Sequence, residues 1–187
     1  MIVVYACLVL AVLAVLIPGG EPRRLAEIEL RWTSLIWGAL LLQVAVISVL
    51  PAAGALSKAA HLATYAAAAL FVVANRRLPG VPIVAVGGAL NLVAIVANGG
   101  TMPADRGALE ASGRRLAEGR FANSAPIEDP RLGFLGDVFA TPSWFPAANV
   151  FSIGDVVIVA GVAFFLYRAT RPRGARAPQA MSPDPAP

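Results

Sequence analysis

The chain has 187 residues, of which 58% are hydrophobic and only 14% are charged. An ordinary soluble domain is about 45–50% apolar and about 25% charged. Because this apolar surplus is too large for the core of a soluble domain of this length, the composition predicts a protein that is largely surrounded by lipid. The formal net charge of +4 does not indicate nucleic-acid binding, since the basic residues are scattered between apolar segments. The single cysteine, Cys7, excludes an intramolecular disulfide, a redox cysteine pair and a thiolate metal cluster.

The first apolar segment covers residues 1–17 and carries no charged side chain. Its length is at the short end of the ~17–25 residues that cross a bilayer as a helix, and we expect it to be a membrane-spanning helix. A cleaved signal peptide is the alternative interpretation. The segment favours retention, because it lacks a basic region at its start and a small-residue cleavage site before Pro18.

Three further apolar segments predict membrane-spanning helices over residues 33–50, 56–74 and 81–97. Pro51 and Gly54 separate the first two of these segments, and a short basic turn separates the next two. The third helix is followed by Asn98-Gly99-Gly100, and glycines in this position commonly end helices.

Residues 98–148 form the one long connection, which we expect to lie outside the membrane. Within this loop, residues 104–118 predict a short helix that Asp105 caps. Residues 132–151 are rich in aromatic residues and proline and contain a single charge, as is typical of a segment at the membrane interface.

A fifth spanning helix is predicted over residues 149–167, and residues 169–187 predict a disordered cytoplasmic tail. The expected fold is therefore all-α: a polytopic bundle of about five transmembrane helices in a single domain over residues 1–168, with one elaborated outer loop. We find no internal repeat and no second, soluble domain.

The distribution of basic residues predicts the orientation, because short cytoplasmic loops carry an excess of lysine and arginine. One face of the predicted bundle would carry nine such residues, in short loops: Arg23, Arg24, Arg31, Arg76, Arg77, Arg168, Arg171, Arg173 and Arg176. The other face would carry six: Lys58, Arg106, Arg114, Arg115, Arg120 and Arg131. We therefore expect the amino terminus and the long loop outside and the carboxyl-terminal tail in the cytoplasm, in a multi-pass membrane protein.

Asp155 is the most informative polar residue, because it would lie about 9 Å inside a span that begins at Asn149. An ionisable residue inside a span is a candidate functional residue. The alternative is that Ser152 and Asp155 cap a helix that begins near residue 153.

Other polar residues in the predicted outer half of the bundle are His61, Gln43 and Asn91. With Asp155 they could form a proton relay or a ligand site, although such side chains more often bond neighbouring helices. Asp137 and Asn149, near the outer face, could help to bind a cation or a lipid headgroup, but Gly-Asp pairs are also common in turns.

No catalytic, cofactor or metal constellation is predicted. Ser152, His61 and Asp155 are the residue types of a hydrolase triad, but the Gly-x-Ser-x-Gly motif is missing. One histidine and one cysteine leave too few nitrogen and sulfur ligands for a zinc site, and no glycine pair is followed by the lysine and serine of a phosphate-binding loop.

Three motifs resemble a known family: NRRLPG at 75–80, NGGTMP at 98–103 and LGFLGDVFATPSWFPAANVFSIGDVVIVAGV at 132–162. The chain resembles, over residues 1 to about 168, the bacterial membrane-protein family designated domain of unknown function 5317 (DUF5317). The resemblance implies a small polytopic inner-membrane protein and no particular activity. The positions that match the family's motif are Asp137, Pro142, Pro146, Asn149, Ser152, Gly154 and Asp155.

We therefore expect a non-enzymatic membrane component or accessory subunit, whose partners are the lipid bilayer and either a membrane protein or a second copy of the chain. A small transporter or channel that uses Asp155 is one alternative. An intramembrane enzyme that uses His61 and Asp155 is another.

Overall fold

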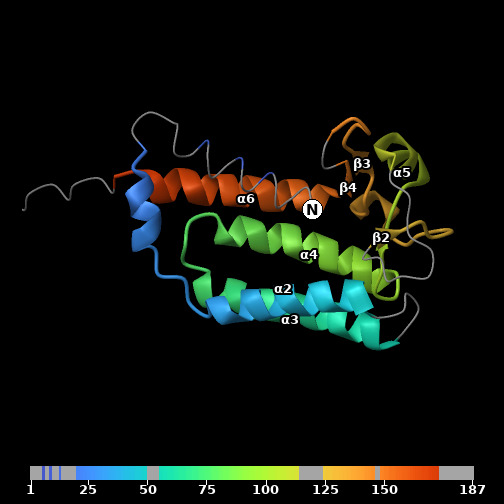
Figure 1. Cartoon of the computed structure of the whole chain (residues 1–187), viewed down its shortest axis with the longest axis horizontal. Coiled ribbons are helices and arrows are strands. Elements are labelled where there is room, and N and C mark those ends of the chain that lie inside the picture. Colours follow the sequence, from blue (N-terminus) through green and yellow to red (C-terminus); the bar gives the residue numbers. More distant parts are fainter. Residues whose placement is uncertain are drawn as a thin grey trace, which may run out of the picture.

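The computed structural model describes residues 20–49, 55–113, 124–145 and 148–172, together with Ala6, Val9 and Leu13 (Figure 1). These three isolated residues are helical. The rest of the helix predicted over 1–17 lies outside the described residues, as does the predicted tail from residue 173 onward.

The described chain is mostly helical. Its four long helices are α2 (Thr33–Val49), α3 (Ala55–Asn75), α4 (Val81–Ala97) and α6 (Ile153–Thr170). The first three follow the predicted segments closely. Among the described helices, α6 alone is both long and apolar enough to cross a membrane. The other three contain shorter apolar stretches.

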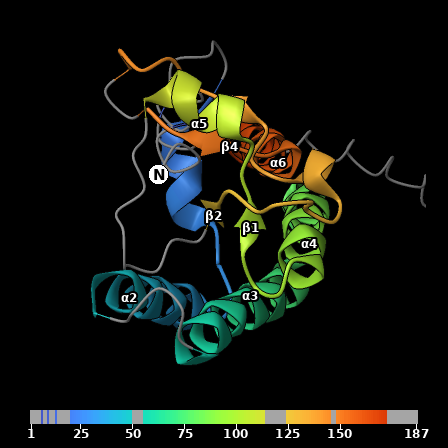
Figure 2. The ribbon, with the colours of Figure 1, turned by 90° about the vertical axis from the view of Figure 1, so that its right-hand side faces the viewer.

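The helices form two close pairs, α2 with α3 and α4 with α6. Seen from the end that carries the strands, the four helices form an arc in the order α2, α3, α4, α6 (Figure 2). At the other end, the short 3₁₀ helix η1 (Pro22–Glu27) packs against α6 and leads into α2 (Figure 1). Its N-cap residue is tied to α6, because the Glu21 amide donates to the Thr170 carbonyl at 2.8 Å.

Glycines allow α4 and α6 to approach each other closely. A Cβ atom on Gly87 would lie 2.5 Å from the Gly154 carbonyl oxygen, and one on Gly154 would lie 2.7 Å from the Gly87 carbonyl oxygen. Seven residues away on each helix, which is about two turns, Gly80 and Gly161 make the same kind of contact. Small residues allow this approach between helices that are apolar on all sides.

The segment between α4 and α6 forms a small cap at one end of the helices. It consists of β1 (Met102–Pro103), α5 (Arg106–Ser112), β2 (Ser124–Ala125), η2 (Gly133–Leu135), β3 (Phe139–Ala140) and β4 (Val150–Phe151). β1 pairs with β2 in parallel, and β3 pairs with β4 antiparallel. The structure is mostly helical, as expected, and the two short sheets in this connection are an addition that the sequence did not predict.

Two apolar clusters hold the cap together and join it to α4. The first, inside the cap, contains Ala104, Ala108, Leu109 and Val150, with Ala140 against it. The second links the end of α4 to the cap and contains Ala94, Ile95 and Met102, with Tyr65 and Leu135 against it.

The local signals in the loop were interpreted correctly at two points. Asp105 caps α5, as predicted, and its carboxylate accepts a hydrogen bond from the Ala108 amide at 2.8 Å. Gly99 and Gly100 end α4 with positive φ angles of 66° and 92°. The Gly100 amide donates to the Ile95 carbonyl, which satisfies one of the last carbonyls of the helix.

The predicted start of the last helix was wrong by four residues. α6 begins at Ile153 rather than at residue 149 and continues to Thr170. Residues 150–151 instead form β4, in which Phe151 lies opposite Phe139 and their rings stack at 5.4 Å. Extended backbone up to the cap residue Ser152 is incompatible with an earlier start.

Candidate functional site

The candidate site is the polar junction where the start of α6 meets α4. Asn91 of α4 donates through Nδ2 to Asp155 Oδ1 at 2.8 Å, and its Oδ1 accepts from the Ser152 hydroxyl at 2.8 Å. One amide side chain therefore bonds both polar side chains at the start of α6. The three residues come together although Ser152 and Asn91 are 61 positions apart in the chain.

The same two residues of α6 form a capping box. The Ser152 hydroxyl accepts from the Asp155 amide at 3.0 Å, and the Asp155 carboxylate accepts from the Ser152 amide through Oδ2 at 3.1 Å. This reciprocal pair satisfies two backbone donors that the first turn of a helix leaves free, and it places a negative charge at the positive end of the helix dipole. The sequence left two interpretations of Asp155 open, and in the structure Asp155 belongs to the N-terminal capping box of α6.

The junction is largely closed to solvent. Ser152 is 0% exposed and Asn91 is 6% exposed, while Asp155 is half-buried. Polar groups in such surroundings are stable only when they are hydrogen-bonded. The Asn91 amide, the Ser152 hydroxyl and the Asp155 backbone amide each donate to an acceptor within the junction. The geometry is that of a structural joint between α4 and α6.

Asp137 lies in the cap and is buried, with 7% of its surface exposed. Its amide donates to the Pro103 carbonyl at 2.8 Å, and its carbonyl accepts from the Asp105 amide at 3.1 Å. The backbone of Asp137 thus fastens the segment after η2 to the strand that leaves α4.

Asn149 takes part in the hairpin that precedes α6. Its amide donates to the Thr141 hydroxyl at 2.8 Å, and its carbonyl accepts from the Thr141 amide at 2.9 Å. These bonds continue the β3–β4 pairing by one residue and fix the point at which the chain turns into Ser152 and α6.

His61 and Gln43 lie within α3 and α2, and their side chains are outside the described part of the structure. A relay or triad that uses His61 therefore remains a prediction.

Two asparagines that the sequence analysis treated only as turn residues make matching contacts at the ends of helices. At the end of α3, Asn75 accepts from the Arg31 amide and donates to the Arg31 and Phe71 carbonyls, at 2.8–2.9 Å. At the end of α4, Asn98 makes the equivalent contacts with the amide and carbonyl of Arg131 and with the Ala94 carbonyl, at 2.7–2.9 Å.

Each asparagine therefore caps its own helix and holds a distant segment to it. Asn75 fastens the chain before α2, and Asn98 fastens the cap. The only signal in the sequence was an asparagine placed at the last turn of an apolar segment, ahead of a basic pair or a glycine pair.

The chemistry available at the junction is limited. The Ser152 hydroxyl donates its proton to Asn91 and accepts from the Asp155 amide, so it is not positioned as a nucleophile beside a base. Among the described residues, no group of three or more histidine, cysteine or acidic side chains could hold a metal ion.

The fold and the junction define a mostly helical protein in which two helix pairs carry a small, firmly attached cap. The chain belongs to the family of unknown function DUF5317, which matches residues 27–167 and so covers the four long helices and the cap. This match confirms the resemblance stated from the motifs. Neither a curated protein nor a solved structure matches the chain.

Proposed function

We propose that the protein is a multi-pass, non-enzymatic component of a bacterial inner membrane and acts as an accessory subunit through its outer cap. In this proposal α2, α3, α4 and α6 all cross the bilayer, and the segment over residues 1–17 is a fifth span. The observation that carries the proposal is the polar junction, whose groups are engaged in joining α4 to the start of α6, next to the cap.

The surface of the helices supports the membrane location. α2 and α4 contain no charged residue. Large apolar side chains point outward along the helices, among them Trp37 at 65% and Leu41 at 69% exposure. Soluble proteins rarely expose apolar patches of this extent. With 18 residues, α6 is about 27 Å long, which is close to the ~30 Å hydrocarbon core of a bilayer.

The junction supports a non-enzymatic role. A general base or a nucleophile needs a free lone pair or proton directed at a substrate. The Ser152 hydroxyl instead donates its proton to the Asn91 side-chain oxygen. The Asp155 carboxylate accepts from the Asn91 side-chain nitrogen and from the backbone amide of Ser152.

The cap carries the surface through which an accessory subunit would act. Phe134 and Trp144 are 67% and 80% exposed, and Trp144 packs edge-on against Phe145. Exposed aromatic side chains are enriched both in protein interfaces and at the membrane surface. The excess of arginine on the opposite end of the helices supports an outward-facing cap.

A labelling experiment tests the location and orientation. In a Cys7→Ser background, single cysteines replace Ser143 in the cap and Glu27 in η1, both of which are exposed. We expect a membrane-impermeant maleimide to label residue 143 in intact spheroplasts and residue 27 only after lysis. Equal labelling of the two positions before lysis would contradict the proposed topology.

A second experiment tests the accessory role. Complexes are extracted from cell membranes in native nanodiscs and weighed by native mass spectrometry, for the wild type and for Phe134→Ser with Trp144→Ser. We expect the wild type to carry a stoichiometric protein subunit that the aromatic variant loses. Glu128→Ser, an exposed polar position of the cap, is the matched control and should retain the subunit. A wild type that contains a single chain and lipid alone would contradict the proposal.

A small cation or proton transporter is the second candidate. It is favoured by Asp155, a half-buried ionisable residue in the first turn of α6 that accepts a hydrogen bond from Asn91 of α4 at 2.8 Å. Ion flux into proteoliposomes distinguishes the candidates. The accessory role predicts no flux above that of empty liposomes, whereas a transporter predicts flux that Asp155→Asn abolishes.

A further inference from the structure

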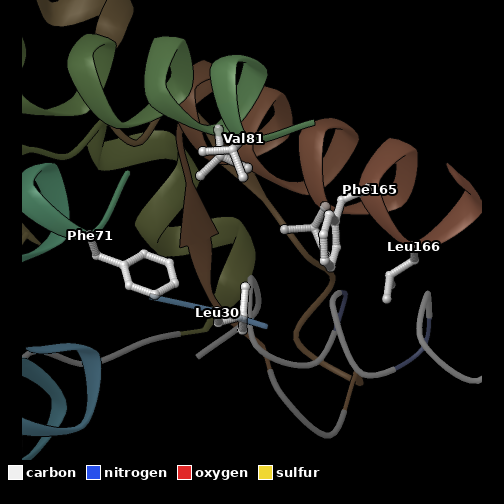
Figure 3. Close-up of a pocket in the computed structure, with 7 residues that line it drawn as sticks. Leu30, Phe71, Val81, Phe165 and Leu166 are labelled. Carbon is white, nitrogen blue, oxygen red and sulfur yellow. The ribbon is translucent and has the colours of Figure 1, made fainter. Parts of the chain in front are cut away.

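An apolar pocket lies at the end of the helices opposite the cap. Its volume is about 290 Å³, and its wall is formed by side chains of α3, α4, α6 and the segment before α2. The lining residues that matter here are Leu30, Phe71, Val84, Val162, Phe165 and Leu166. Figure 3 shows Phe71 and Phe165 on opposite sides of this space, with Leu30 closing it on a third side.

The mouth of the pocket is a built feature. Asn75, which is 4% exposed, holds the backbone of Arg31 through two hydrogen bonds of 2.9 Å. This contact fixes Leu30 in the pocket wall and places Arg31 beside the end of α3. Arg76 and Arg77 follow Asn75 directly, so the backbone positions of three arginines lie near one another at this end of the helices, and we refer to them as the basic rim.

These three arginines are available to an anion. All three are exposed, and no ion pair joins them to another residue of the described chain. Arg76 has one hydrogen bond, from Nη1 to the Val73 carbonyl at 3.1 Å.

The acidic residues near this rim do not neutralise it. Glu21 is engaged with Arg23 and Arg24. Glu27 and Glu29 are exposed and lie before Arg31 in the chain. Within the described chain, neither of these two acidic residues forms an ion pair with Arg31, Arg76 or Arg77.

We propose that this site binds one anionic phospholipid, with an acyl chain in the apolar pocket and the phosphate between Arg31, Arg76 and Arg77. The proposal rests on the membrane location given above. Arginine is suited to phosphate because its planar donors bind two oxygens at once. A volume of about 290 Å³ is at the lower edge of the ~300–1,000 Å³ typical of ligand pockets, which fits one chain rather than a whole lipid.

The depth of the pocket agrees with this pose. Val81 and Val84, which line the pocket, lie in the first turn of α4, directly after the turn that carries Arg76 and Arg77. The pocket thus begins at the level of the basic rim and extends into the adjacent leaflet, as an acyl chain does below its headgroup.

Native mass spectrometry of the delipidated full chain in detergent tests the site. Phosphatidylglycerol and phosphatidylcholine with identical acyl chains are titrated separately, and inorganic phosphate is added as a competitor. We expect one phosphatidylglycerol to bind at least about tenfold more tightly than phosphatidylcholine. We expect inorganic phosphate to compete poorly, because it cannot use the pocket. Equal binding of the two lipids, or efficient competition by phosphate, would overturn the proposal.

Two pairs of variants separate the pocket from the rim. Val162→Phe narrows the pocket and should weaken phosphatidylglycerol binding at least about tenfold, whereas Val156→Phe, on the exposed side of the same helix, should not. If both leave binding unchanged, the pocket is not the site and the proposal is overturned.

The rim is tested by replacing Arg31, Arg76 and Arg77 with Gln, compared with Arg168→Gln and Arg171→Gln. The second set also lies at this end of the helices, at the end of α6. We expect only the first set to remove the preference for phosphatidylglycerol. Equal losses would show general attraction to basic charge and would overturn the specific site. The cysteine labelling described above is independent of lipid binding, so failure of this proposal is distinguishable from failure of the membrane topology.

Discussion

Gly87→Ala tests the close packing of α4 on α6. The added methyl group would lie 2.5 Å from the Gly154 carbonyl oxygen and 2.8 Å from the backbone nitrogen of Ile158. Both atoms belong to the backbone, so the helices must move apart by several tenths of an ångström. This movement also strains the bonds that Asn91 makes one turn further along α4.

The expected magnitude combines two opposing effects. Overpacking of this kind typically costs about 1–3 kcal/mol. Weakening of the interhelical hydrogen bonds of Asn91 adds only a fraction of the roughly 0.6–2 kcal/mol that a whole bond contributes. Alanine recovers up to about 1 kcal/mol, because it favours the helical conformation more than glycine does. We therefore expect Gly87→Ala to destabilise the protein by about 1–3 kcal/mol.

The matched control is the adjacent Gly88→Ala, where an added methyl group meets no atom within 4 Å. This variant should be neutral or more stable, because only the helix propensity changes. The assay is thermal unfolding in detergent, followed by circular dichroism. At about 2–4 °C per kcal/mol for a chain of this size, Gly87→Ala should lower Tm by roughly 2–12 °C. Equal Tm values for the two variants would refute the packing argument.

Three further predictions concern the polar contacts. Ser152→Ala removes the N-cap of α6 and leaves the Asn91 side-chain oxygen without its donor, so we expect the stability measured by thermal unfolding to fall by about 1–2 kcal/mol. Ser143→Ala, in the exposed part of the cap, is the control and should leave the stability unchanged. Asn98→Asp removes the donor to the Ala94 and Arg131 carbonyls, so amide hydrogen exchange should become faster in the cap and stay unchanged in α2. Exchange in the cap at the wild-type rate would contradict the role of Asn98. Hydrogen bonds from Arg23 and then Arg24 lower the pKa of Glu21 below its ordinary value of 4.5, so the stabilisation of η1 is present above that pH and is lost as the pH falls through the lowered pKa. A carboxyl-carbon NMR titration of Glu21 should show a midpoint below 4.5, and a midpoint at or above this value would be inconsistent with the two contacts.

The helices that the sequence predicted well are those with strong boundaries. α4 runs over the predicted residues 81–97, because Pro79-Gly80 precedes it and two glycines follow it. The start of α6 was predicted poorly, because a hairpin of two-residue strands is too short to show an alternating pattern.

The packing of α4 on α6 was not predicted, although the spacing of Gly80 from Gly87 and of Gly154 from Gly161 is visible in the sequence. The two helices are apolar on nearly all sides, so no amphipathic pattern indicates which face of either helix packs. Contacts between helices in such a protein depend on shape rather than on hydrophobicity.

The candidate site was predicted in part. Ser152 and Asp155 were recognised as a possible cap from their spacing of three residues, which is a local signal. Asn91 was expected to bond a neighbouring helix, but its partners lie more than sixty positions away in the chain and could not be named. Asn75 and Asn98 were missed because their bonds are made to the backbone of distant segments.

Asn91, Ser152 and Asp155 form a structural joint between α4 and α6, and exchanging the side chains of Asn91 and Asp155 is the sharpest test of that joint. Asn91→Asp alone places two carboxylates together and should cost about 2–4 kcal/mol. Asp155→Asn alone loses one of the two bonds that the carboxylate accepts and should cost about 1 kcal/mol.

The variant that carries both substitutions restores one amide facing one carboxylate, with acceptors for Ser152 at both positions. We predict that its free energy of unfolding in detergent recovers at least half of the loss measured for Asn91→Asp. An exchanged variant that is no more stable than Asn91→Asp would contradict the claim, because the pairing of the two side chains would then contribute nothing to the fold.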